Sequence, residues 1–80
     1  MTRDARLRWL CRRGMKELDV LLERYLEQDY AQTTEPQRAA FRALLECQDP
    51  VLWDYVMERD QPQDEDMQDV IRKLASALRG

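Results

Sequence analysis

Apolar residues recur at intervals of three and four along most of the chain, and this spacing constrains the fold more than any other feature. The clearest case is a stripe of side chains that share one face of a helix: Met67, Val70, Ile71, Leu74 and Leu78. Only two glycines and three prolines interrupt such patterns in 80 residues. The sequence therefore predicts an all-α fold, a compact bundle of about five short helices that forms a single domain over residues 1–80.

Gly14 lies between the first two helical patterns. The first pattern can be capped by Thr2 or Asp4 and runs to about Arg12. The second runs over residues 15–30. A glycine at such a junction is typical of a helix end in the left-handed conformation, which costs glycine least because it has no Cβ. A purely structural role would be enough to explain Gly14. A functional role therefore needs evidence beyond this helix junction.

Proline-containing segments give start signals for the later helices. Residues 31–33 form a connection, and Thr34 then opens a capping box, with glutamine three residues later. Asp49 directly before a proline favours another start, because its carboxylate can accept from the free N–H groups of the first turn. That helix is expected to run to about Glu58. A polar link over residues 60–64 precedes the last stripe.

The composition excludes several kinds of active site. The chain has no histidine, the commonest general base at neutral pH and the commonest zinc ligand. Cys11 and Cys47 belong to no C-x-x-C pair, and we expect them to be small core hydrophobes in a reducing compartment. No G-x-G-x-x-G or G-K-[ST] segment can cradle a phosphate. We therefore expect a protein that holds no cofactor and no metal and acts by contact, not as an enzyme.

Charge is unevenly distributed. Residues 1–16 carry six basic side chains against Asp4, a balance of +5, and because the whole chain carries −3 the remainder carries −8. A basic end is compatible with nucleic-acid binding, but the acidic remainder would repel phosphates, so we expect no nucleic-acid partner. The sequence contains no run of eighteen apolar residues, and we expect no direct membrane insertion.

Trp9 lies off the apolar face of the first helix. At 100° per residue it falls almost opposite Leu7 and Leu10. Arg6 and Arg13 lie on its side of the helix. A tryptophan flanked by arginines has the composition of an interface hot spot. Packing of Trp9 under another helix is equally compatible with the pattern.

Two longer segments carry a resemblance to a known family. They are RWLCRRGMKELD, residues 8–19, and LLECQDPVL, residues 44–52. In this order they resemble the succinate dehydrogenase FAD assembly factors, the bacterial members especially. The R-G-x-x-E motif of that family is matched by Arg13, Gly14 and Glu17.

The resemblance implies a small helical protein that binds the flavoprotein subunit of succinate dehydrogenase, and in bacteria often that of fumarate reductase, and promotes covalent attachment of FAD to it. The FAD and the acceptor histidine would belong to the partner. Mitochondrial members begin with an acid-poor import segment, whereas this chain has Asp4, so we expect a bacterial cytoplasmic protein that is monomeric when free.

The motif and its neighbours are the predicted partner-binding site: Arg6, Trp9, Arg12, Arg13, Gly14, Met15, Glu17 and Asp19. Gly14 offers a bare backbone that a partner can approach closely. Arg13 can make a bidentate contact, and Glu17 supplies an acceptor one turn into the next helix. We expect a rigid clamp with both signs of charge, which holds the flavoprotein so that its isoalloxazine ring and histidine are aligned.

Two other functions are compatible with the sequence. Members of the same family have been described as the antitoxin-like regulatory partner of a small membrane protein. An enzyme acting on a small molecule would have Cys11, beside Arg12 and Arg13, as its only candidate nucleophile. The place of Cys11 on the apolar arc argues against that second function.

Overall fold

The computed structural model describes residues 3–79 and contains helices and no strand within them. The elements are α1 Arg3–Leu10, α2 Lys16–Gln28, the short 3₁₀ helix η1 Tyr30–Gln32, α3 Glu35–Leu44, α4 Asp49–Val56 and α5 Glu65–Arg79. The predicted all-α bundle of five helices is confirmed. The cap predicted at Thr2 lies outside the described residues.

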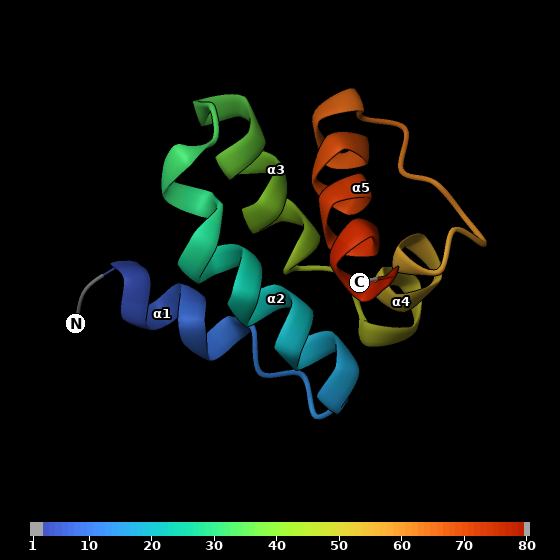
Figure 1. Cartoon of the computed structure of the whole chain (residues 1–80), viewed down its shortest axis with the longest axis horizontal. Helices are drawn as coiled ribbons and strands as arrows, with labels where there is room; N and C mark the ends of the chain where they lie inside the picture. The colour runs from blue at the N-terminus through green and yellow to red at the C-terminus, as the bar shows by residue number, and fades with distance from the viewer. Residues whose placement is uncertain (1–2, 80) are drawn as a thin grey trace.

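The C-terminal helix is the centre of the arrangement. Helix α5 packs most extensively against α3 and also contacts α2 and α4, while α1 lies against α2 (Figure 1). Figure 1 shows α1 and α4 on opposite sides of the molecule. The connection between α1 and α2 therefore runs from one flank of the bundle toward the other.

The helix start predicted at Thr34 is confirmed in detail, and the start predicted at Asp49 is right in position but wrong in its cap. The Thr34 hydroxyl accepts from the Gln37 amide at 3.3 Å. Asp64 likewise accepts from the Met67 amide at 3.0 Å. Asp49 does not cap α4, because Gln48 occupies the cap position and Asp49 is the first helical residue. Its carboxylate accepts from a guanidinium instead, a charge-assisted bond that is stronger than a bond from a neutral amide.

Helix ends differ from the sequence prediction by a few residues. Helix α1 ends at Leu10 instead of Arg12, and a tight turn follows in which the Arg12 amide donates to the Trp9 carbonyl at 3.1 Å. Gly14 is left-handed as predicted, with φ +83°, but it lies in the loop after that turn and does not itself end the helix. The periodicity of side chains does not show where a helix ends, because the end is defined by backbone hydrogen bonds.

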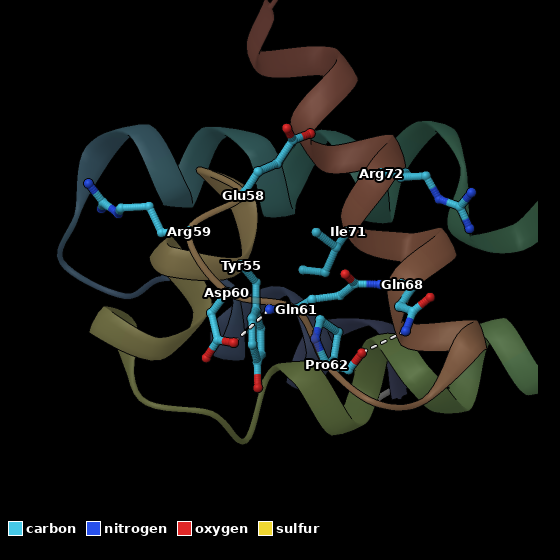
Figure 2. Close-up of a pocket in the computed structure, with 9 residues that line it drawn as sticks. All are labelled: Tyr55, Glu58, Arg59, Asp60, Gln61, Pro62, Gln68, Ile71 and Arg72. Atoms are coloured by element: carbon cyan, nitrogen blue, oxygen red, sulfur yellow. Dashed lines mark hydrogen bonds between the residues drawn. The ribbon is translucent and has the colours of Figure 1, made fainter.

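The α4 to α5 connection borders an open depression of about 590 Å³ (Figure 2). Tyr55 of α4, Pro62 of the connection and Ile71 of α5 line it. The Gln68 side chain holds the connection by donating to the Pro62 carbonyl at 2.8 Å. None of the predicted site residues lines this depression.

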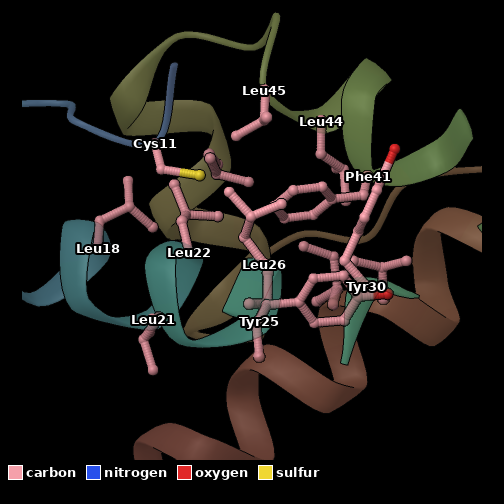
Figure 3. Packing of buried hydrophobic residues seen from close by; sticks show 14 of the residues in the cluster. Cys11, Leu18, Leu21, Leu22, Tyr25, Leu26, Tyr30, Phe41, Leu44 and Leu45 are labelled. Carbon is pink, nitrogen blue, oxygen red and sulfur yellow. The ribbon is translucent and has the colours of Figure 1, made fainter. Parts of the chain in front are cut away.

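A single cluster of buried apolar side chains joins all five helices (Figure 3). At its centre the rings of Tyr25 and Phe41 stack with centroids 4.6 Å apart, and Tyr30 of η1 approaches Phe41 at 5.6 Å. Cys11 is completely buried in this cluster, as predicted, and Cys47 packs against it. Because α1 contributes Leu7 and Cys11, the loop that follows α1 starts from a fixed point in the core.

The predicted packing face of α5 is correct over its middle turns and wrong at its end. Its buried residues are Val70, Ile71, Leu74 and Ala75. Met67 is only partly buried. Leu78 is 39% exposed, because it lies in the last turn of α5, one turn past the buried residues.

Candidate functional site

The R-G-x-x-E motif forms one corner of the molecule, which we call the Gly14 corner: the loop of residues 11–15 and the first turn of α2, residues 16–19. Gly14 is exposed at its tip, and a Cβ built on it would meet no atom of the described residues within 4 Å, its two chain neighbours aside. The space above Gly14 is therefore open to solvent. Within the chain, only its left-handed backbone favours glycine at this position.

The Arg13 side chain points inward and is only 11% exposed. Its Nε donates to Asp49 Oδ1 at 2.8 Å. Its Nη1 donates to the carbonyls of Leu10 at 3.0 Å and Leu45 at 2.7 Å, and its Nη2 donates to the carbonyl of Cys47. The guanidinium thus joins the end of α1, the end of α3 and the start of α4.

This arrangement changes the role predicted for Arg13. The sequence suggested that its guanidinium faces a partner, but four of its hydrogen bonds are made within the chain. The backbone of Arg13 is held as well, since its amide donates to Asp19 Oδ1 at 2.6 Å. The structure therefore brings Arg13 and Asp19 together inside the corner.

Asp49 is a component of the corner that the sequence analysis missed. It lies 36 positions from Arg13, and its place before a proline was explained as a helix cap. No periodic or motif signal links two residues at that separation. Only the segment LLECQDPVL, which carries part of the family resemblance, pointed to this region at all.

The exposed members of the predicted site lie around this fixed centre. Glu17 is exposed and forms no ion pair or side-chain hydrogen bond within residues 5–79. Trp9 is 71% exposed on the outer face of α1, so the alternative in which it packs under another helix is wrong. Arg6 is also exposed, and Arg12 contacts Glu23 only at 3.9 Å.

Met15 differs from these exposed residues. It is the cap residue of α2, and its side chain is partly buried against the core. Packing against the core is therefore sufficient to explain why an apolar residue follows Gly14. A contact between Met15 and a partner stays a prediction.

Cys11 has the properties of a core thiol and not those of a nucleophile. Burial raises its pKa to about 12, and the negative charge of Glu23 adds to the shift. Because the reactive form of cysteine is the thiolate, a thiol with this pKa is protonated and unreactive at neutral pH. Across the described residues, no group of three or more cysteine and carboxylate side chains is placed to hold a metal ion.

The described part of the chain also includes no helix that is long and apolar enough to cross a bilayer. The longest element, α5 Glu65–Arg79, has 15 residues and carries charged side chains along its outer face. A helix needs about 20 apolar residues to span the hydrocarbon core.

Comparison with known proteins shows close relatives. Residues 5–78 match the protein-family model described as the flavinator of succinate dehydrogenase. The FAD assembly factor SdhE of Idiomarina loihiensis is 45% identical over 74 residues, which are 92% of this chain and 82% of that protein.

Two further relatives agree with this match. The FAD assembly factor SdhE of Pseudomonas aeruginosa is 41% identical over 91% of this chain and 87% of its own length. The protein of the same name from Coxiella burnetii is 39% identical over 89% of this chain and 87% of its own length. The chain therefore belongs to the family of succinate dehydrogenase flavinators.

Proposed function

We propose that this protein binds the flavoprotein subunit of succinate dehydrogenase and promotes the covalent attachment of FAD to it. Membership of the flavinator family is the observation that carries the proposal. The protein acts as an assembly factor and not as an enzyme. FAD and the histidine that receives it belong to the partner, which is consistent with a chain that has no histidine and no glycine-rich phosphate loop.

The Gly14 corner is the surface that we assign to the flavoprotein subunit. Gly14 leaves its backbone uncovered, and Glu17 offers an exposed carboxylate in the first turn of α2. Trp9 adds the most exposed apolar side chain of α1, and tryptophan is among the residues that dominate binding energy at protein interfaces. Trp9 and Glu17 lie on α1 and α2, which both contribute side chains to the core.

The protein contributes to the reaction by positioning its partner. A rigid corner that docks on the flavoprotein subunit can stabilise the conformation in which flavin and histidine are aligned. Holding reacting groups in a productive geometry is worth several kcal/mol of barrier, so no catalytic side chain on this protein is required.

The proposal extends to the flavoprotein subunit of fumarate reductase, and to action as a monomer in the bacterial cytoplasm. The relatives named above are all bacterial proteins. Two purified flavoprotein subunits, titrated separately with this protein, test the range of partners.

Flavin fluorescence in denaturing gels tests the main proposal, because only covalently bound FAD stays with the flavoprotein subunit. Co-expression with the wild-type protein should give a fluorescent subunit band, and Gly14→Ala and Glu17→Ala should reduce it. The matched control is Glu65→Ala, which also removes an exposed carboxylate from the first turn of a helix and, within residues 5–79, one without an ion-pair partner.

Both substitutions should leave the protein folded. Gly14→Ala meets no steric contact and should destabilise it by about 1 kcal/mol, through the left-handed backbone alone. Wild-type fluorescence with folded Gly14→Ala and Glu17→Ala would show that this corner is not the site. Co-purification of a small membrane protein in place of the flavoprotein would favour the regulatory function instead.

A further inference from the structure

Arg13 stabilises the ends of two helices at the same time. The Leu10 carbonyl ends α1 and the Leu45 carbonyl ends α3, and carbonyls in these positions lack intrahelical partners. The guanidinium satisfies both, and its positive charge also suits the negative end of each helix dipole. The Cys47 carbonyl and the Asp49 carboxylate occupy the remaining side of the fork.

The loop of the Gly14 corner is consequently held from two directions. On one side the Arg13 amide donates to Asp19, in the first turn of α2. On the other side the Arg13 guanidinium is bonded to the segment that joins α3 to α4. Gly14 is the next residue, so these bonds determine where its bare backbone is presented.

The exposed chemistry of the motif is therefore simpler than its sequence suggests. The positive charge of Arg13 is used inside the chain, where its side chain is 11% exposed. The carboxylate of Glu17 is the exposed charge that the motif presents, and it has no counter-ion within residues 5–79. An unpaired carboxylate beside an uncovered backbone is complementary to a cationic side chain or a group of N–H donors.

We propose that Arg13 is a positioning residue, which holds the Gly14 corner in shape through Asp49 and the helix-end carbonyls, and that Glu17 is the residue that contacts a basic or N–H donor group of the flavoprotein subunit. This inference rests on the proposed function. It differs from a clamp in which Arg13 and Glu17 both touch the partner, because it divides the motif into one internal and one external charge.

Substitution of Asp49 distinguishes a positioning role of Arg13 from a direct contact between Arg13 and the partner. If Arg13 positions the corner, then Asp49→Ala removes one of its anchors and loosens the loop. If Arg13 contacts the partner directly, the same change frees the guanidinium and leaves binding intact or tighter. Asp54→Ala is the matched control, because Asp54 lies on the same helix and pairs with Arg59 away from the corner.

The experiment measures two properties of each purified full-length variant below its melting temperature. The first is the Kd for the purified flavoprotein subunit, and the second is amide hydrogen exchange of the free protein. Asp49→Ala should raise exchange locally in residues 11–15 and 45–48 and weaken binding by about tenfold. Glu17→Gln should weaken binding by a similar factor without changing exchange, and Asp54→Ala should change neither.

Arg13→Ala should show the same local increase in hydrogen exchange and a larger loss of binding. If Arg13→Ala does not fold, Asp49→Ala alone tests whether Arg13 positions the corner. Unchanged or tighter binding by Asp49→Ala would overturn the positioning role. Full affinity in Glu17→Gln would overturn its assignment as the contact. If the wild-type protein does not bind the subunit, the proposed function fails, while exchange in Arg13→Ala and Asp49→Ala still decides whether Arg13 holds the loop.

Discussion

Gly14 and Glu58 are both left-handed, with φ of +83° and 62°, but they occupy very different places. Gly14 is at the tip of the Gly14 corner, where the missing side chain leaves the backbone uncovered. Glu58 follows the end of α4, and its carboxylate pairs with Arg79 near the end of α5. A left-handed conformation costs a residue with a Cβ about 1 to 2 kcal/mol, so only the corner position avoids the penalty.

The two cysteines should differ sharply in reactivity. A thiol reagent at pH 8 is expected to modify Cys47, which is partly exposed, and to leave Cys11 unmodified until the protein unfolds. Burial raises the Cys11 pKa from its ordinary 9.0 to about 12, so the folded state retains a proton that the unfolded chain loses. Stability should therefore be unaffected by this thiol below pH 9 and should fall as the pH rises from 9 toward 12.

Counting reactive thiols in native and denatured protein checks this expectation. One thiol should react quickly in the native state and two in denaturant, and Cys47→Ser should abolish the fast reaction. Two equally fast thiols in the native protein would contradict the burial of Cys11.

At the scale of helices, α5 shows how apolar periodicity and packing can disagree. Five residues share its apolar stripe in the sequence, but burial extends only over the middle turns. Leu74 is 1% exposed and packs among residues of the core, whereas Leu78 on the same face is 39% exposed. The periodicity of a helix defines a face, and its neighbours determine how much of that face is covered.

Leu74→Ala should destabilise the protein by about 2 to 5 kcal/mol, because it leaves a cavity between α5 and the helices packed on it. A domain of this size has a stability of only about 5 to 15 kcal/mol, so the loss should be obvious in thermal unfolding. Leu78→Ala on the same helix is the control and should change stability far less. Equal melting temperatures for Leu74→Ala and the wild type would contradict the packing of α5.

At the scale of the whole molecule, the basic N-terminal end is less positive than its sequence indicates. Arg8 pairs with Glu27 at 2.7 Å, which places an acid of α2 against an arginine of α1. Arg13 is turned inward. Within residues 5–79, Arg6 and Lys16 form no ion pair and remain the free basic charges of this end. Exposed basic charges of this kind can steer a protein partner toward this end of the molecule.

Arg6→Glu should slow association with the flavoprotein subunit severalfold while leaving the dissociation rate and the melting temperature nearly unchanged, as expected for a charge at the rim of an interface. The difference from the wild type should shrink as salt is raised, because exposed charges are screened. Association kinetics at two salt concentrations measure this. Binding of duplex DNA or RNA at physiological salt, lost in Arg6→Glu, would instead favour a nucleic-acid partner.

Local signals in the sequence were sufficient for most of the fold. Apolar spacing predicted the helices, and Thr34 predicted the start of α3. The pattern also excluded Trp9 from the apolar arc, although only the structure shows that Trp9 is exposed. These properties depend on residues within a few positions of one another, whose geometry a helix makes regular. The family resemblance also located the motif that forms the corner, and the comparisons support it.

The direction of the Arg13 side chain was decided only by the tertiary structure. A surface arginine in a loop and an arginine that bonds the ends of two helices look the same in a sequence, because three of the four acceptors lie 32 to 36 positions away. The same holds for Asp49, whose local signal as a cap was outweighed by a charged partner from another segment. Sequence by itself determined which elements form and where the motif lies. The packing of α1 against α2 and the position of the segment that joins α3 to α4 determined which charge of the motif faces inward, because the guanidinium and the helix-end carbonyls meet only after the bundle closes.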